Sequence, residues 1–259
     1  MNAAWAGLRL AVGTLTMIPA GHIPPPTRRV GAWSMALAPV AALPLGVLVA
    51  ATCLLGRWLA LPALVTASLS IGALALATRA LHLDGLADTA DGIGAGWDRE
   101  RALRVLRTGD VGPMGVAALL VVVLVQIAAV AALQEIARGW LLVGAAVVAS
   151  RVAATLGCLR GLPPAEGSTL GVVVASTVPG PVGAVVVGAT AAALTTAGTL
   201  AGLPWWQGAA AVVALLAVVG WVVRSALRVF GGINGDVLGA VIEVGLGTLL
   251  VVLTVGIAS

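Results

Sequence analysis

Three carboxylates lie close together in one short segment of the chain. Asp84, Asp88 and Asp91 fall within eight consecutive positions, although the whole sequence contains only 10 acidic residues. In a helix, the spacing i, i+4, i+7 places all three on one face. The segment directly follows a long apolar run, where clustered carboxylates are costly unless a cation balances their charge. Because carboxylate oxygens suit Mg²⁺ and Mn²⁺, the pattern predicts a metal site. The alternative is a solvated helix end that carries ordinary surface acids.

A glycine-rich loop near the carboxyl end of the chain carries a second group of candidate residues. Gly232, Asn234 and Gly235 precede a predicted helix, and backbone N–H groups in such a loop can bind a phosphate. Asp236 lies where the loop meets the helix. Its carboxylate is therefore expected either to bind a metal or to cap the helix.

Basic residues between the apolar runs are candidates for binding phosphate. Arg104 and Arg107 share one helical face at i, i+3, so they are expected either to clamp phosphate oxygens or to bind lipid headgroups. Arg151, near the end of an apolar run, and Glu166, in a Pro- and Gly-containing loop, are weaker candidates for substrate binding.

Two further ionisable residues have more than one interpretation. His82 precedes the acidic cluster by two positions and is a candidate base, metal ligand or hydrogen-bond donor. With no second histidine near it, a His-ligated zinc site is not expected. Glu243 lies inside an apolar run, where an ionisable side chain indicates function. Its alternative role is to pair with Arg224 or Arg228.

The composition is that of an integral membrane protein. Hydrophobic residues make up 60% of the chain, charged residues only 9%, and the mean hydropathy is +1.11, whereas soluble domains carry about 25% charged residues. We expect one all-α domain over residues 1–259, a polytopic bundle of about seven transmembrane helices. An interfacial helix is expected over residues 3–18. The net charge of +4 does not indicate a nucleic-acid partner. The candidate spans cover residues 31–55, 59–80, 113–133, 140–159, 181–203, 205–223 and 237–257.

The arginines predict how the chain lies in the membrane. All 14 basic residues are Arg, and 12 of them fall before the first span or between spans two and three, four and five, and six and seven. Only Arg57 and Arg138 fall on the opposite side. By the positive-inside rule, the arginine-rich side is cytoplasmic. Nine of the 10 acidic residues lie on that side too, so we expect a polar site that faces the cytoplasm at the bilayer surface.

The segment from His82 to Gly92 resembles the signature of a known enzyme family. It reads His-Leu-Asp-Gly-Leu-Ala-Asp-Thr-Ala-Asp-Gly and is similar to the signature of the membrane-bound cobalamin-5′-phosphate synthases, also called adenosylcobinamide-GDP ribazoletransferases. One stretch departs from that family: where members often carry Arg/Lys-Asp-Ser/Pro-Arg-x-Gly, residues 107–112 read Arg-Thr-Gly-Asp-Val-Gly. The other stretches that agree with it in order and approximate spacing are residues 14–19, 150–151, 166–167 and 231–240, together with Glu243.

The resemblance implies a late step in assembly of the cobalamin nucleotide loop. A hydroxyl of α-ribazole or its 5′-phosphate attacks the phosphate attached to cobinamide in adenosylcobinamide-GDP, and GMP leaves. Asp84, Asp88, Asp91 and Asp236 would hold Mg²⁺ on the diphosphate, while one of these acids or His82 would accept the hydroxyl proton. Arginines would bind the departing GMP. The implied partners are these small molecules and the lipid bilayer of a bacterial inner membrane, and no nucleic acid is expected. Whether the chain forms a homo-oligomer is left open.

Three other functions compete with this interpretation. A CDP-alcohol phosphotransferase is expected to show Asp-Gly-x-x-Ala-Arg before its later acids, whereas Asp88 directly follows Ala87 here. An aspartate-rich prenyltransferase is expected to carry acids at four-residue spacing on two helices, which only Asp84 and Asp88 satisfy. An ion or solute transporter predicts acids near the midplane and repeat symmetry, and the sequence shows neither.

Overall fold

The computed structural model describes residues 2–22, 25–96, 100 and 110–257. Over these residues the chain is all-helical and contains no strand, which confirms the predicted fold class. The helices, with bounds in chain order, are α1 (Ala3–Leu15), α2 (Arg28–Ala36), α3 (Ala38–Ala41), α4 (Leu43–Trp58), α5 (Ala63–Ala77), α6 (Leu81–Gly94), α8 (Pro113–Gln134), α9 (Gly139–Ser150), α10 (Val152–Gly157), α11 (Thr169–Val174), α12 (Gly180–Leu200), α13 (Gln207–Val229) and α14 (Gly235–Leu253).

Five helical segments among the described residues are long and apolar enough to cross a membrane. They are α8, the pair α9 and α10, α12, α13 and α14. A sixth span arises only if α5 and α6 are counted together, and these two helices are bent by 89°. The chain is thus a multi-pass membrane protein, but the predicted count of seven spans is not confirmed.

The first predicted span, residues 31–55, is divided into three helices. The helical geometry breaks at Leu37 and at Ala42, and each break is followed within two residues by a proline in the first turn of the next helix. Proline has no N–H to donate and its ring clashes with the preceding turn, so helices break where it occurs. The longest continuous piece, α4, has 16 residues.

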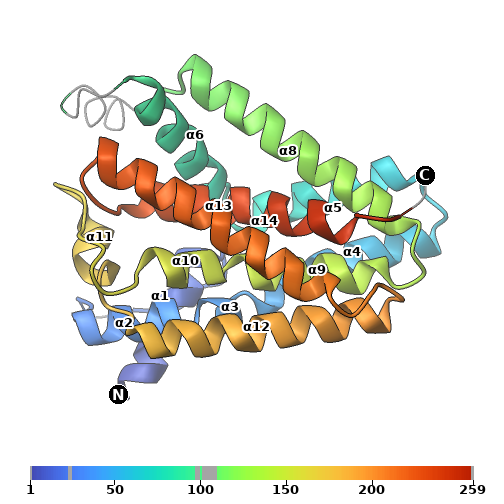
Figure 1. Cartoon of the computed structure of the whole chain (residues 1–259), viewed down its shortest axis with the longest axis horizontal. Helices are drawn as coiled ribbons and strands as arrows, with labels where there is room; N and C mark the ends of the chain where they lie inside the picture. Colours follow the sequence, from blue (N-terminus) through green and yellow to red (C-terminus); the bar gives the residue numbers. More distant parts are fainter. Residues whose placement is uncertain (1, 23–24, 97–99, 101–109, 258–259) are drawn as a thin grey trace.

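Helix α14 runs through the middle of the bundle, whereas α8 and α12 lie on opposite edges (Figure 1). Within the apolar window of α14, 72% of the residues are buried, compared with 22% for α8 and for α12. The two outer helices therefore present most of their apolar side chains outward, as expected for helices that face lipid. α14 packs against α6, α8, α9, α10 and α13.

A sharp turn separates α5 from α6. Arg79 and Ala80 both adopt left-handed backbone conformations, with φ of 54° each. A run of two non-glycine residues in this region cannot continue an α-helix. After the turn, α6 packs across α14 instead of extending α5. The two helices therefore form either a broken span or a re-entrant loop.

Candidate active site

Helices α6 and α14 cross at two glycines that allow their backbones to touch. A Cβ atom on Gly85 would lie 2.7 Å from the backbone oxygen of Asp236, and one on Gly239 would lie 3.0 Å from the backbone oxygen of His82. Small residues at a crossing permit this close approach of helices in membranes. The crossing brings the acidic segment and the glycine-rich loop, which are far apart in the sequence, into one place.

The loop before α14 ends in a side-chain cap, and the capping residue is Asn234. Its Oδ1 accepts a hydrogen bond from the backbone N–H of Val237 at 2.9 Å. Its Nδ2 donates to Asp236 Oδ2 at 2.8 Å. The interpretation of Asp236 as the N-cap is therefore wrong. Asp236 lies in the first turn of α14, where the helix dipole favours a negative charge, and Asn234 orients its carboxylate.

The predicted Glu166 loop lies directly against the glycine-rich loop. Ile233 donates its N–H to the carbonyl oxygen of Pro163 at 2.8 Å and accepts from the N–H of Ala165 at 2.9 Å. A Cβ on Gly232 would collide with the backbone of Pro164, so glycine at position 232 allows the two loops to touch. Glu166 itself is exposed beside it. Substrate binding by Gly232 and Glu166 stays a prediction.

A cavity of ≈ 320 Å³ opens between α1, α6 and α14. Among its lining residues are Thr14 from α1, His82 and Asp84 from α6, and Gly235 and Asp236 from α14. Asp84 is exposed and Asp236 is half-buried. Residues from three separate predicted motifs thus line one cavity whose size suits a small-molecule ligand.

Asp91 has a different environment from its two helix neighbours. The residue is only 7% exposed, and its carboxylate accepts hydrogen bonds from the backbone N–H groups of Gly112 at 2.6 Å and Gly115 at 2.8 Å. These are free N–H groups at the start of α8, which a carboxylate stabilises. A Cβ on Gly115 would collide with the Asp91 carboxylate. The hydrogen bonds of Asp91 therefore hold α8 against α6. Asp91 is not among the described residues that line the cavity.

Asp88 lies on α6 one turn after Asp84, with its side chain half-buried. The carboxylates of Asp84, Asp236 and Asp91 lie near enough for their charges to act on the Asp88 carboxyl group. Like charges in one place disfavour the ionised form of each carboxyl group, and a bound cation relieves that cost. The electrostatics at this end of α6 therefore suit a cation.

The described residues provide only part of the predicted metal site. No three His, Cys, Asp or Glu side chains among them are arranged to hold a metal ion, so the predicted set of four aspartates is not assembled. Asp84 and Asp236 do line the same cavity. Two carboxylates fit Mg²⁺, which commonly takes one or two from the protein and completes its shell with phosphate oxygens and water.

Arg151 lies in the interior and not at the cavity. Its side chain is fully buried and donates to the carbonyl oxygen of Val147 at 2.9 Å and to Ser150 Oγ at 2.8 Å. The predicted substrate contact is not formed, because no surface of Arg151 is accessible to a ligand. A fully buried guanidinium requires polar partners, and the charge of the buried Glu243 carboxylate also acts on Arg151.

A buried polar cluster is built around Glu243. Gln126 donates to Glu243 Oε2 at 2.9 Å, and His82 Nδ1 lies 3.9 Å from Glu243 Oε1. Pairing of Glu243 with Arg224 or Arg228 was the wrong expectation, because both arginines are exposed near the end of α13. Sequence reasoning missed Gln126, although an amide inside the apolar run of α8 was a visible signal.

Two predicted phosphate-binding residues, Arg104 and Arg107, lie outside the described residues. The divergent stretch of residues 107–112 is described only from Asp110 onward, and Asp110 is exposed.

The fold and the cavity define a class: multi-pass, all-helical membrane proteins with carboxylates around a small-molecule site. The sequence matches the model of the family described as cobalamin-5-phosphate synthase over residues 7–254. The chain belongs to this family, as the motifs indicated. The match favours this family over the three competing functions considered from the sequence.

Several curated relatives, all called adenosylcobinamide-GDP ribazoletransferase, align along most of the chain. A Nocardioides relative is 44% identical over 96% of this chain and 97% of its own length. A relative from Frankia casuarinae is 38% identical over 96% and 94%, respectively. One from Corynebacterium efficiens is 34% identical over 97% and 92%. No solved structure matches the chain.

Proposed function

We propose that the chain joins adenosylcobinamide-GDP to α-ribazole or its 5′-phosphate and releases GMP. Relatives that align over 97% and 94% of their own length carry the name of this activity. The observation that carries the proposal is the cavity itself, because Thr14, Asp84 and Asp236 come from three family-like motifs and line one space. The product is adenosylcobalamin or its 5′-phosphate.

The reaction exchanges one phosphorus–oxygen bond for another. The acceptor hydroxyl oxygen forms a bond to the phosphorus attached to cobinamide, the bond from that phosphorus to the bridging oxygen of GMP breaks, and GMP leaves with the electron pair. The hydroxyl proton passes to a carboxylate at the cavity, for which Asp84 is the most accessible. His82 also lines the cavity. Catalysis of this kind relies on positioning and charge stabilisation.

We further propose that Mg²⁺ binds between Asp84 and Asp236 and takes its remaining ligands from the substrate diphosphate and water. Bound there, it would neutralise the diphosphate and the leaving phosphate. The support is the two carboxylates in one cavity and the like-charge crowding around Asp88. Asn234 holds the Asp236 carboxylate in place through its amide, and the α6–α14 crossing sets the separation of the two acids.

The site faces the cytoplasm of the inner membrane in this proposal. Twelve of the 14 arginines lie on the same side of the predicted spans as the acidic segment, which supports a cytoplasmic location by the positive-inside rule. Nucleotide substrates are present there, and no transport step is then required before the reaction.

The test is release of GMP by the purified protein in phospholipid, given Mg²⁺, adenosylcobinamide-GDP and α-ribazole 5′-phosphate. Wild type should release GMP, and Asp84→Asn should lower the rate by about 10²-fold or more. Glu135→Gln, which removes an exposed carboxylate beyond the other end of α8, is the matched control and should keep the wild-type rate. No GMP from wild type would refute the proposed activity. Undiminished release in EDTA would refute only the Mg²⁺ requirement.

A further inference from the structure

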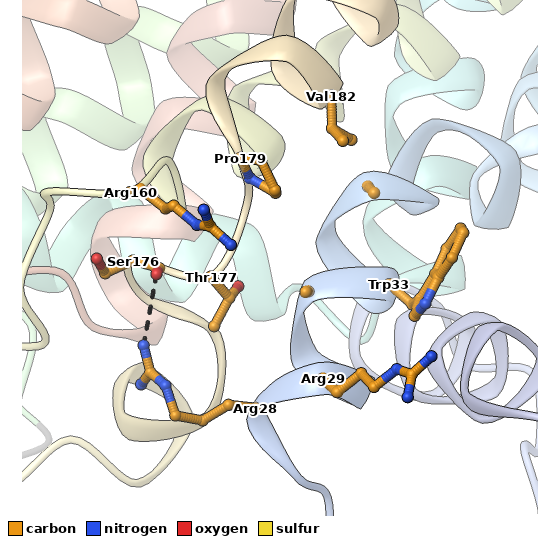
Figure 2. Close-up of a pocket in the computed structure, with 10 residues that line it drawn as sticks. Arg28, Arg29, Trp33, Arg160, Ser176, Thr177, Pro179 and Val182 are labelled. Atoms are coloured by element: carbon orange, nitrogen blue, oxygen red, sulfur yellow. Dashed lines mark hydrogen bonds between the residues drawn. The ribbon is translucent and has the colours of Figure 1, made fainter.

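A second cavity, of ≈ 480 Å³, lies between α2, the loop that follows α11, and the start of α12. Figure 2 shows Arg28, Arg29 and Arg160 around it, with Trp33 on the α2 side and Val182 on α12. None of these arginines was singled out from the sequence beyond its count on the cytoplasmic side. We call this space the arginine pocket.

The arginine pocket carries positive charge that no acid in it neutralises. No carboxylate is among the described residues that line it. Arg28 is fixed, because its guanidinium donates to the carbonyl oxygens of Val172 at 2.7 Å and Ala175 at 2.8 Å. Arg29 and Arg160 are exposed, and the described part of the chain offers their guanidinium groups no hydrogen-bond or ion-pair partner. Two guanidinium groups are thus free to bind an anion.

The start of α12 adds to this positive potential. The helix has 21 residues and begins at Gly180 beside the arginine pocket, and no side chain hydrogen-bonds its N-terminus in the part of the chain that the structure describes. The first N–H groups of such a helix and its dipole favour an anion. Arginine pairs with phosphate through two parallel hydrogen bonds, so phosphate is the anion that best matches the pocket.

An apolar groove of ≈ 510 Å³ continues from the arginine pocket along α12. The two spaces share Ala36. Val182 lines the pocket, and the groove is lined by Val185, Val186, Ala189, Thr190, Ala193 and Leu194 on successive turns of α12. Its other wall comes from α3, α4 and α9 and carries no charged side chain among the described lining residues. A charged head region followed by an apolar channel matches the shape and chemistry of a phospholipid.

The arginine pocket is separate from the candidate active site. Arg29, Trp33 and Ala36 line the pocket from one side of α2, whereas Met35 lines the active-site cavity from another. The two spaces share no described lining residue. A ligand in the pocket therefore need not take part in the transfer reaction.

We propose that the arginine pocket and the groove together bind one anionic glycerophospholipid. Arg160 binds the headgroup phosphate, Arg29 and Arg28 add positive charge around it, and an acyl chain lies along α12. The apolar groove decides between a lipid and a soluble phosphate, because a nucleotide would leave it empty. Trp33, 41% exposed at the edge of the pocket, is of the type that anchors proteins at the membrane interface.

The test is native mass spectrometry of detergent-purified protein with equal amounts of phosphatidylglycerol and phosphatidylcholine of identical acyl chains. Wild type should retain phosphatidylglycerol in preference, by about tenfold or more. The double variant R29Q/R160Q should lose that preference. Ala189→Trp, which fills the groove without changing charge, should reduce binding of both lipids.

Two matched controls accompany these variants. Arg224→Gln removes an exposed arginine outside the pocket, and Ala184→Trp enlarges an exposed residue of α12 outside the groove; both should bind lipid as wild type does. Equal retention of the two lipids by wild type would overturn the proposal, as would an R29Q/R160Q protein that keeps the preference. Displacement of phosphatidylglycerol by GMP would also overturn it and would assign the pocket to a nucleotide. Because no GMP release is measured, the outcome is independent of the proposed activity.

Discussion

Replacement of Gly85 by alanine tests whether the α6–α14 crossing positions the active site. The added Cβ would lie 2.7 Å from the backbone oxygen and 2.9 Å from the Cα of Asp236. Both are backbone atoms, so no side-chain rotation can relieve the contact. Ordinary contact begins at 3.4 Å, which requires the two helices to separate by about 0.7 Å in a closely packed interior.

Two energies oppose each other in this variant. Alanine favours a helix over glycine by about 1 kcal/mol, whereas forcing an extra methyl group into a packed interface costs about 1–3 kcal/mol. The net change in stability should therefore be small. The catalytic effect should be larger, because a displacement of about 1 Å at a reacting group can cost about 10²-fold in rate. Asp236 is the residue that moves.

The assay is the initial rate of GMP release in phospholipid, with the thermal unfolding midpoint measured on the same preparation. We expect Gly85→Ala to lower the rate by about 10- to 100-fold while the unfolding midpoint changes by a few degrees. Gly239→Ala, whose Cβ would lie 3.0 Å from the backbone oxygen of His82, should show a smaller loss.

The control is Gly220→Ala on α13, where an added Cβ meets no heavy atom within 4 Å. It should keep the wild-type rate and gain slightly in stability. The reasoning is refuted if Gly85→Ala releases GMP as fast as Gly220→Ala does. Loss of rate in all three variants would likewise show that the close approach of α6 to Asp236 is not the cause.

Three further variants test single contacts. Asp91→Ala leaves two N–H groups of α8 without partners and should cost about 1–3 kcal/mol for each, measured as a lower unfolding midpoint; an unchanged midpoint would remove its assigned role. Glu243→Ala removes the carboxylate whose charge acts on the buried Arg151 and should destabilise by about 3–5 kcal/mol. Glu243→Gln removes the same charge but keeps an acceptor for Gln126, so it should destabilise almost as much; an unchanged midpoint in Glu243→Gln would contradict the charge argument. Asn234→Ala should cost about 1 kcal/mol as a lost helix cap and also slow GMP release through Asp236, so a normal rate would argue against orientation of that carboxylate.

The helix carrying the acidic segment could be predicted because its evidence is local. Asp84 and Asp88 are one helical turn apart, and α6 does form over them. The environment of Asp91 was not predictable, since both of its hydrogen bonds go to N–H groups 21 and 24 residues away. No local pattern states which helix end a carboxylate will meet.

The membrane spans were likewise predictable where local hydropathy decided them and not where packing did. The later spans agree with α8, α12, α13 and α14 to within six residues at each end, because about 20 apolar residues in a row leave few alternatives to a membrane helix. The first predicted span failed as one helix at Pro39 and Pro44. Membrane helices tolerate proline where neighbours satisfy the freed carbonyl groups, so only the packing decides whether a proline breaks the helix.

By itself the sequence determined that the chain forms helices long enough for a membrane and carries family motifs around Asp84 and Asp236. The tertiary structure alone decided which polar residues meet. It enclosed Arg151 and turned Asp91 toward α8. It also gathered Arg28, Arg29 and Arg160 from distant segments into one pocket. The physical reason is that propensity and hydropathy act between near neighbours, whereas hydrogen bonds and charge contacts depend on how helices cross.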